Sequence, residues 1–245
     1  MTGKEDDPEG IRINKFLSEA GTASRRSSDR IIEEGRVTID GRTAVLGDKV
    51  LPGSKVCVDG KEVKRVSEDI ILAFYKPAGI TSTSDPGDEN NVIDYIGYPR
   101  RIFSIGRLDK DSEGLLLMTN NGELADKIMR SKNEHEKEYL VKVNKNITPE
   151  FVERMSKGVL LDDGKLTKKC IVETEGPKEF RIILRQGLNR QIRRMCEQLG
   201  YEVKHLKRIR VVNITLGDLK EGRYRDITKR ERDELYRQLG LSKEK

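Results

Sequence analysis

Apolar positions near the start of the chain recur at helical spacing. A first short helix, ended by Gly21, is predicted from four residues spaced i, i+3, i+4 and i+7: Ile13, Phe16, Leu17 and Ala20. Ser24 can cap a second helix, which turns Ile31 and Ile32 inward and ends at Gly35. The pattern therefore begins with two consecutive short helices.

The pattern then changes to short β-runs separated by turns. Residues 37–39 alternate like a strand and lead into Asp40-Gly41, a hairpin signal that recurs at Asp59-Gly60. We expect a small ααβ module over residues 10–60. The polar start, residues 1–9, is expected to be a disordered tail, and residues 61–69 read as a linker.

Strand patterns outnumber helix patterns in the remainder, residues 70–245. Helices are predicted over 123–130, after Thr148-Pro149, and over 190–199 and 228–239. Strands are predicted over 70–75, 115–119, 139–143, 180–184 and 201–216. Because several strands are joined by hairpin signals, we expect an α+β domain with a mixed, largely antiparallel sheet.

Charge is concentrated in one segment of the chain. The 245 residues carry a formal net charge of +6, with 35% hydrophobic and 37% charged residues. Residues 185–210 hold eight Arg or Lys against two acids, so this window alone carries +6. Such clustering favours a polyanionic partner over an evenly solvated surface.

The number and spacing of the cysteines and histidines bear on whether the chain holds disulfides or a metal ion. The three cysteines, Cys57, Cys170 and Cys196, lie far apart without a C-x-x-C pair, and only two histidines occur. We therefore expect no disulfide framework and no metal centre, and a reducing cytosolic location. Since the sequence shows neither a membrane-length apolar run nor a signal peptide, we expect no membrane association.

Asp109 is the first candidate for chemistry. It lies between two predicted strands, in a polar segment with Arg107, Lys110 and Asp111. A lone aspartate at such a place usually caps a turn. The neighbouring cations favour a second interpretation, in which they keep a partly buried carboxylate ionised and nucleophilic. Asp111 fits a solvent-facing or turn-forming role better.

Tyr139 and the basic helix also allow two interpretations each. Tyr139 can be an ordinary core aromatic of a strand or a surface that stacks on a nucleobase. The helix predicted from about Asn189 carries Arg190, Arg193 and Arg194. These side chains can be a solvated face, or they can bind phosphates and place a cation against Asp109.

Three segments in this order resemble the motifs of RNA pseudouridine synthases. They are "GRLDKDSEGLLLMTNNGEL", "KEYLVKV" and "NRQIRRM", and the tail "LGDLKEGRYRDIT" is similar to the same family. The type resembled modifies ribosomal RNA and is typified by small-subunit pseudouridine synthase A. The start, "RINKFLSEAGTASRRSSDRIIEEGRVTIDGR", resembles the RNA-binding module named after ribosomal small-subunit protein four. The resemblance covers residues 11–239.

Finer details resemble the large-subunit branch of this family, named after large-subunit rRNA pseudouridine synthase F. They include "HEKEYLV", "TKKCIV" and Asn189-Arg190, where small-subunit relatives have an aromatic-His pair. Two positions depart from the family pattern: Tyr75 stands where Asn is usual, and Tyr224 where Trp is common. Neither lies in the catalytic motif.

The resemblance implies an isomerase that converts a ribosomal RNA uridine, in 23S rRNA, to pseudouridine without a cofactor. It implies that Asp109 is the catalytic carboxylate, that Tyr139 stacks on the uracil and that Arg193 pairs with Asp109. A base inside a duplex must be flipped out first, and Arg107 would fill its place. Further RNA contacts are expected at Arg190, Arg194, Lys207, Arg208, Arg25, Arg26 and Arg30.

Some alternatives stay open. The chain can be a ribosome-assembly factor that binds RNA without catalysis, although Asp109, Tyr139 and Arg193 are all present. A helix-turn-helix DNA regulator over residues 14–35 fits poorly, because Glu33 and Glu34 end its second helix. A transfer RNA is a possible second substrate. We expect a monomer.

Overall fold

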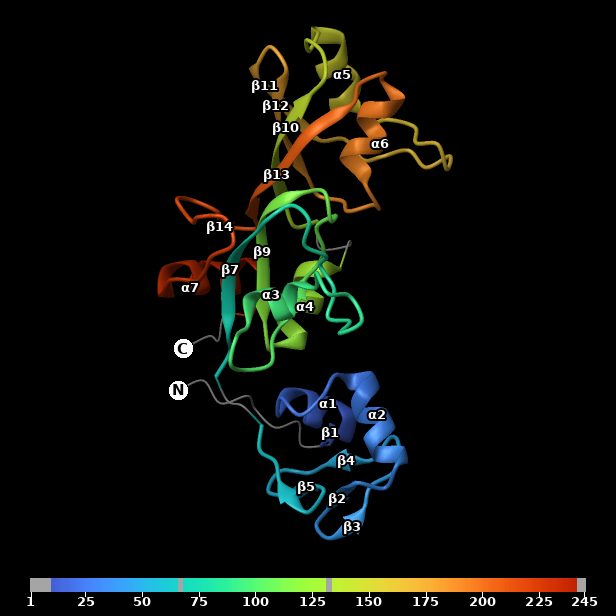
Figure 1. Ribbon diagram of the computed structural model, residues 1–245, viewed down its shortest axis with the longest axis vertical. Coiled ribbons are helices and arrows are strands. Elements are labelled where there is room, and N and C mark those ends of the chain that lie inside the picture. Colours follow the sequence, from blue (N-terminus) through green and yellow to red (C-terminus); the bar gives the residue numbers. More distant parts are fainter. Residues whose placement is uncertain (1–9, 66–67, 131–133, 242–245) are drawn as a thin grey trace. The chain divides into compact units, whose positions relative to one another are not determined.

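The computed structural model describes residues 10–65, 68–130 and 134–241, which form two compact units (Figure 1). The first unit comprises residues up to 70 together with 99–102 and 120–122, and the second comprises 71–98, 103–119 and the residues from 123 onward. The predicted tail, residues 1–9, lies outside the described residues.

The first unit has the predicted helices and hairpins. Helix α1 (Ile13–Glu19) is followed by α2 (Arg25–Glu33), whose Ser24 cap accepts a hydrogen bond from the Ser27 backbone N–H. A four-stranded sheet has the order β3-β2-β5-β6, and a separate pair joins β1 to β4. The strands are β1 (Ile11–Arg12), β2 (Val37–Ile39), β3 (Arg42–Thr43), β4 (Lys49–Val50), β5 (Val56–Val58) and β6 (Lys61–Glu62).

The linker prediction over 61–69 began too early. Strand β6 pairs with β5 around the Asp59-Gly60 turn, and the Val63 N–H still donates to the Val56 carbonyl. The polar pair Lys61–Glu62 is exposed, because an edge strand needs only backbone hydrogen bonds and not burial. Because both residues of β6 are polar, the sequence pattern did not indicate this last strand of the module.

The second unit contains a nine-stranded mixed sheet. Its order is β11-β12-β10-β13-β9-β7-β15, with β14 added to β13 and β8 added to β9, and only the β13–β9 pairing is parallel. The strands are β7 (Ile71–Lys76), β8 (Phe103–Ile105), β9 (Glu113–Thr119), β10 (Lys137–Val143), β11 (Ile171–Gly176), β12 (Glu179–Leu184), β13 (Val203–Val211), β14 (Ile214–Thr215) and β15 (Tyr224–Asp226). The predicted α+β class with a mixed, largely antiparallel sheet is confirmed.

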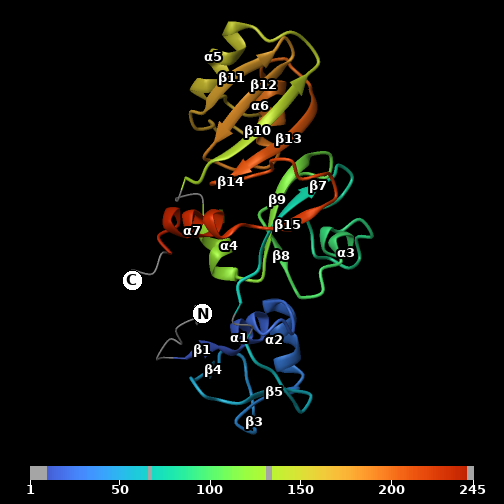
Figure 2. The same ribbon diagram turned by 90° about the vertical axis from the view of Figure 1, so that its left-hand side faces the viewer.

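Five helices accompany this sheet: α3 (Val92–Ile96), α4 (Gly122–Met129), α5 (Pro149–Lys157), α6 (Gln191–Gln198) and α7 (Lys229–Gln238). One core cluster packs α5 and α6 on one face of β10–β13 through residues such as Phe151, Met195 and Ile182. Figure 2 shows β11, β12, β10 and β13 side by side, with α6 behind them. A second cluster joins α4 and α7 to β7 and β9. In the described residues, no helix is long and apolar enough to cross a membrane.

Gly114 brings the two halves of the sheet together. It has φ +108, and a Cβ built on it would lie 2.3 Å from the Arg208 carbonyl oxygen. The parallel pairing of β9 with β13 needs this close approach, which only glycine allows. The loop that precedes β9 is thereby fixed beside β13.

Candidate active site

A cleft of about 560 Å³ lies in the second unit, on the side of the sheet covered by α6. Asp109 and Tyr139 both line it, although thirty residues of chain separate them. Further lining comes from Arg107 and Arg190 and from the loop 184–190. The sequence therefore folds so that the candidate carboxylate and the candidate stacking ring face one cavity with a strongly cationic wall.

The loop that carries Asp109 is held by hydrogen bonds on both sides. Ser82, with only 4% of its surface exposed, donates its hydroxyl to the Leu108 carbonyl at 2.9 Å and accepts the Leu108 N–H at 3.1 Å. The Gly79 N–H donates to the Lys110 carbonyl at 2.7 Å, and the Ser112 N–H donates to the Asp109 carbonyl at 3.1 Å. These bonds fix the backbone immediately before and after the carboxylate.

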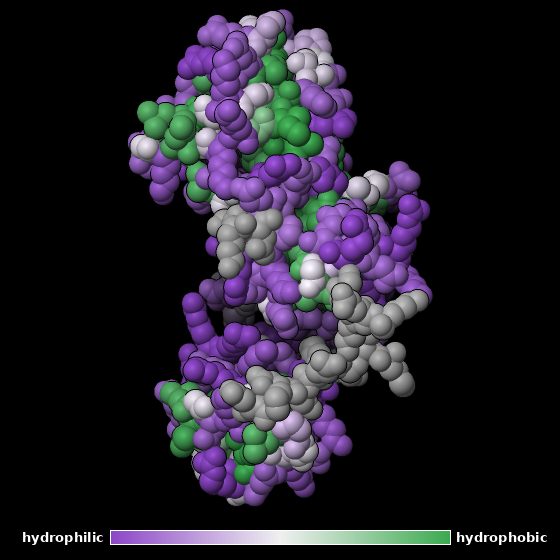
Figure 3. Space-filling view, turned by 180° about the vertical axis from the view of Figure 1, so that it is seen from behind, coloured by the Kyte–Doolittle hydropathy of each residue, from purple (hydrophilic) through white to green (hydrophobic). Residues whose placement is uncertain are grey.

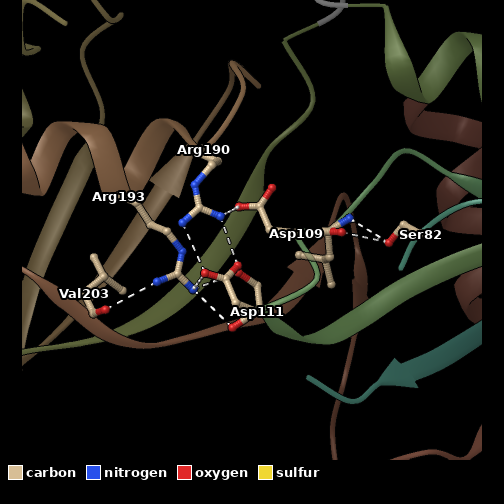
Figure 4. A network of polar contacts seen from close by, with 8 residues as sticks. Ser82, Asp109, Asp111, Arg190, Arg193 and Val203 are labelled. Carbon is tan, nitrogen blue, oxygen red and sulfur yellow. Dashed lines mark hydrogen bonds and ion pairs between the residues drawn. The ribbon is translucent and has the colours of Figure 1, made fainter. Parts of the chain in front are cut away.

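Arg190 is the cation nearest to Asp109. Its Nη1 lies 3.7 Å from Asp109 Oδ2, and its two Nη atoms each donate to one oxygen of Asp111 at 3.1 Å (Figure 4). Arg190 precedes α6 as its N-cap, in a left-handed conformation with φ 47. The helix therefore begins at Gln191 and not at Arg190. The left-handed backbone of Arg190 directs its guanidinium toward the carboxylates of Asp109 and Asp111.

Arg193 contacts Asp111 and its neighbours, so the expected pairing with Asp109 is wrong. Its Nη2 donates to the Asp111 carbonyl and to the Ser112 hydroxyl, both at 3.2 Å, and lies 3.4 Å from Asp111 Oδ2. Its Nη1 donates to the Val203 carbonyl at 3.3 Å. Only 9% of its side chain is exposed, so Arg193 joins α6, β13 and the 109–112 loop from inside (Figure 4).

Electrostatics keep the second carboxylate charged. Desolvation acts to raise the pKa of Asp111, but the Arg190 hydrogen bond and the charges of Arg193 and Arg190 together hold that pKa below its usual value. Asp111 was expected to face solvent or form a turn. It is 48% exposed, yet it is the carboxylate that binds both arginines.

Lys76 is a cation that sequence patterns did not single out. Its side chain is fully buried and donates to the Pro77 and Ile80 carbonyls at 2.7 and 2.8 Å. Burial lowers the pKa of Lys76 to about 8, against the opposing pull of the Asp111 and Asp109 carboxylates. Lys76 thus closes the turn after β7 and adds positive charge beneath the loop of Asp109.

Tyr139 stands on β10 between Ile182 of β12 and Arg208 of β13. The register shifts between Glu138 and Tyr139, which marks a bulge in the pairing with β13. The ring is half-buried: it packs against the α5–α6 core and also lines the cleft. The Tyr139 side chain therefore packs against the core and also reaches the cavity. Its stacking on a nucleobase stays a prediction.

Three predicted RNA contacts have other partners in the structure. Arg194 binds Asp162 and Asp163, with Nε 2.7 Å from Asp162 Oδ1. Lys207 lies over the Tyr75 ring at 4.7 Å, on the sheet face opposite to Arg208, because neighbouring residues of a strand alternate. Arg208 is 2% exposed and donates to the Leu115 and Arg107 carbonyls. Their roles as phosphate contacts stay predictions.

The other predicted RNA contacts have accessible side chains. Arg107 is exposed and lines the cleft beside Asp109. Arg25, Arg26 and Arg30 are exposed on α2 of the first unit. Their roles toward RNA stay predictions.

The sequence pattern also gave no indication of two serine hydroxyls that support the site. Ser82 and Ser112 are almost completely buried, and each bonds a group in or next to the 109–112 loop. A serine in a polar stretch carries no signal of such a role. Among the described residues, the His, Cys, Asp and Glu side chains form no group of three or more that could hold a metal ion.

Comparison with known proteins agrees with this geometry. The RNA pseudouridylate synthase family model matches residues 70–198, which include the cleft loop, Tyr139 and α6, and the S4 domain model matches residues 11–56. The chain belongs to the RNA pseudouridylate synthase family. The family resemblance stated from the motifs is confirmed, and so is the small amino-terminal RNA-binding module.

Relatives in this family span most of the chain. The dual-specificity RNA pseudouridine synthase RluF of Escherichia coli (strain K12) is 51% identical over 229 residues, which cover 93% of this chain and 79% of that protein. The ribosomal large subunit pseudouridine synthase B of Bacillus subtilis (strain 168) is 38% identical, over 90% of this chain and 93% of its own.

Among solved structures, a crystal structure of a pseudouridylate synthase matches with TM-score 0.69 and 26% identity, covering 92% of this chain and all of that chain. The fold is therefore that of an RNA pseudouridine synthase, and the alternative of a DNA regulator is excluded.

Proposed function

We propose that this synthase converts a uridine of large-subunit ribosomal RNA to pseudouridine, with Asp109 as the catalytic carboxylate. The observation that carries the proposal is the shared cleft, in which Asp109 is 29% exposed, 3.7 Å from a guanidinium and in one cavity with the Tyr139 ring. The large-subunit substrate is supported by the names of the similar proteins.

The reaction balances without an outside group. The N1–C1′ bond of the uridine breaks, the uracil turns, and a C5–C1′ bond forms; C5 loses one proton and N1 gains one. A carboxylate beside the ribose serves this chemistry either by attacking the sugar or by removing its C2′ proton. In both routes the detached base must be held, and the Tyr139 ring offers the stacking surface.

The cations have separate roles in this proposal. Arg190 lies at the mouth of the cleft with 43% of its side chain exposed, so it can meet a substrate phosphate as well as Asp109. Arg193 is a positioning residue, because its bonds reach the backbone and Ser112 behind the cleft. Arg107 enters the space that a flipped nucleotide leaves, a role supported by its exposed position in the cleft lining.

A tritium-release assay tests the proposal. The chain is incubated with a large-subunit rRNA transcript labelled with tritium at uracil C5, and release of tritium to water reports the new C5–C1′ bond. A transfer RNA transcript forms the second arm, since the relative RluF carries dual specificity in its name. We expect release from the ribosomal transcript. Failure with the ribosomal transcript would contradict the proposal, whatever the transfer RNA arm shows.

The oligomeric state and the cellular location of the protein are part of the same proposal. We propose that the synthase acts in the cytoplasm, on its ribosomal RNA substrate, and that it acts as a monomer. Light scattering of the purified chain, with a mass near 27.9 kDa for a monomer, checks this.

A further inference from the structure

A short hairpin over residues 158–167 projects next to the cleft helix α6. Its two arms meet at a bridge between Leu160 and Leu166, and the Thr167 N–H donates to the Val159 carbonyl at 3.0 Å. Gly158 has φ +98, and a Cβ on it would lie 2.4 Å from the Thr167 carbonyl oxygen, so glycine allows the arms to close. The two arms of the hairpin are therefore closed by backbone contacts at its base.

Two leucines point outward from this hairpin. Val159 and Leu161 are 6% and 3% exposed and belong to the core cluster of α5 and α6. Because side chains alternate along an extended arm, the residues between and opposite them point away from this core. Leu160 and Leu166, the bridge partners, are 61% and 67% exposed. These two neighbouring leucines therefore form a small exposed apolar surface on the hairpin.

The hairpin is continuous with the wall of the cleft. Arg194 binds Asp162 and Asp163 at the tip of the hairpin. Arg194 lies one helical turn after Arg190, which lines the cleft. The Lys168 N–H donates at 2.9 Å to the side chain of Gln186, another lining residue. Figure 1 shows the hairpin extending beyond α6, and in Figure 3, seen from behind, the corresponding edge of the molecule is hydrophobic.

From these contacts we infer that Leu160 and Leu166 form an apolar wedge that packs against unstacked nucleobases of the RNA flanking the target uridine. This inference rests on the proposed function and names a further part of its RNA-binding surface. An RNA is favoured over a protein partner because the exposed Lys165, Lys168 and Lys169 lie on or next to the hairpin, and because Lys168 contacts Gln186 of the cleft lining. Leucines inserted between base steps are a common way to hold an unstacked nucleic acid.

The wedge has a direct kinetic test. Leu160→Ser and Leu166→Ser are combined in one variant, and Ile171→Ser is the matched control, since Ile171 is 48% exposed but alternates with the buried Val172 on β11. Pseudouridine formation is measured in single turnover over a range of rRNA transcript concentrations. We expect the double variant to need about ten times more RNA for half-saturation, with a plateau rate within two-fold of wild type. Ile171→Ser should match wild type.

Fluorescence of the RNA gives an independent readout. 2-Aminopurine placed beside the modified uridine becomes brighter when its stacking is lost. We expect binding of the wild type to brighten it, and the double variant to brighten it much less at saturating protein. Because both leucines are exposed, the double variant should melt within about 2 °C of wild type, so a change in binding cannot be ascribed to unfolding.

Each contrary outcome is distinct. Equal half-saturation and equal fluorescence in wild type and double variant would overturn the wedge and leave the proposed function intact. A loss of plateau rate without a change in half-saturation would also overturn the wedge. An effect seen only on large-subunit particles that carry ribosomal proteins would overturn it too, because it would assign the leucines to a protein partner. An inactive wild type would instead overturn the proposed function.

Discussion

Replacing Arg193 by methionine should destabilise the protein far more than the same change at Arg190. Methionine keeps most of the aliphatic volume of arginine and removes the guanidinium. At Arg193 this loses three hydrogen bonds, to the Val203 carbonyl, the Asp111 carbonyl and the Ser112 hydroxyl. Two of these acceptors lie in the loop that carries Asp109.

The magnitudes follow from burial. Each of the three bonds contributes about 1 kcal/mol, so Arg193→Met should lower the free energy of unfolding by about 2–3 kcal/mol. For a unit of this size the melting temperature should fall by about 5–10 °C. Arg190 and Asp111 are 43% and 48% exposed, and an exposed ion pair contributes less than about 1 kcal/mol. Arg190→Met should therefore melt within about 3 °C of wild type.

Differential scanning calorimetry of both variants measures this difference, and single-turnover pseudouridine formation is assayed beside it. We expect both variants to lose activity, Arg193→Met through a loosened loop and Arg190→Met through the lost contact near Asp109. Equal melting temperatures for Arg193→Met and wild type would refute the assignment of Arg193 as the internal tie. A large drop for Arg190→Met would refute the ranking of the two cations.

Three further predictions concern parts outside the cleft. Arg25→Ala combined with Arg26→Ala should weaken RNA binding and reduce the slope of log affinity against log salt by about 2, while the plateau rate stays unchanged; an unchanged slope in a filter-binding titration would count against it. Arg225 and the Thr228 cap lower the pKa of Glu231 to about 2, so Glu231→Gln should cost about 2 kcal/mol of unfolding free energy at pH 7. Since that stabilisation is present above the unfolded pKa near 4.5 and is lost as the pH falls toward 2, the difference from wild type in urea unfolding should shrink below about pH 4.5. Gly114→Ala should destabilise by at least about 2 kcal/mol, because its Cβ would meet the Arg208 carbonyl; a melting temperature equal to wild type would be inconsistent with the close β9–β13 approach.

Local signals in the sequence predicted most elements correctly. Ser24 caps α2 and Thr228 caps α7 with a full capping box, and in both helices the cap stands directly before the apolar periodicity. The uninterrupted apolar run 70–75 predicts β7, whose six residues, Ile71–Lys76, are all buried. These features depend on neighbours within a few residues, so they can be read from the sequence without the fold.

Pairings between distant residues could not be read in this way. Whether Arg190 or Arg193 meets Asp109 depends on the left-handed bend at the start of α6 and on the position of α6 against a loop some eighty residues away. The clustering of basic residues in 185–210 also suggested one RNA-facing surface. Strand alternation in β13 instead sends Lys207 and Arg208 to opposite faces, and acids on the 158–167 hairpin bind Arg194.

The role of Asp109 is tested most directly by comparing Asp109→Asn with Asp111→Asn in single-turnover pseudouridine formation at saturating rRNA transcript. Both changes keep the side-chain shape and remove one negative charge, and the two residues share Arg190. We predict that Asp109→Asn binds the RNA within about three-fold of wild type and forms no pseudouridine, whereas Asp111→Asn forms it at a reduced rate. Normal turnover by Asp109→Asn, or equal inactivity of the two variants, would contradict the assignment of Asp109 as the catalytic carboxylate.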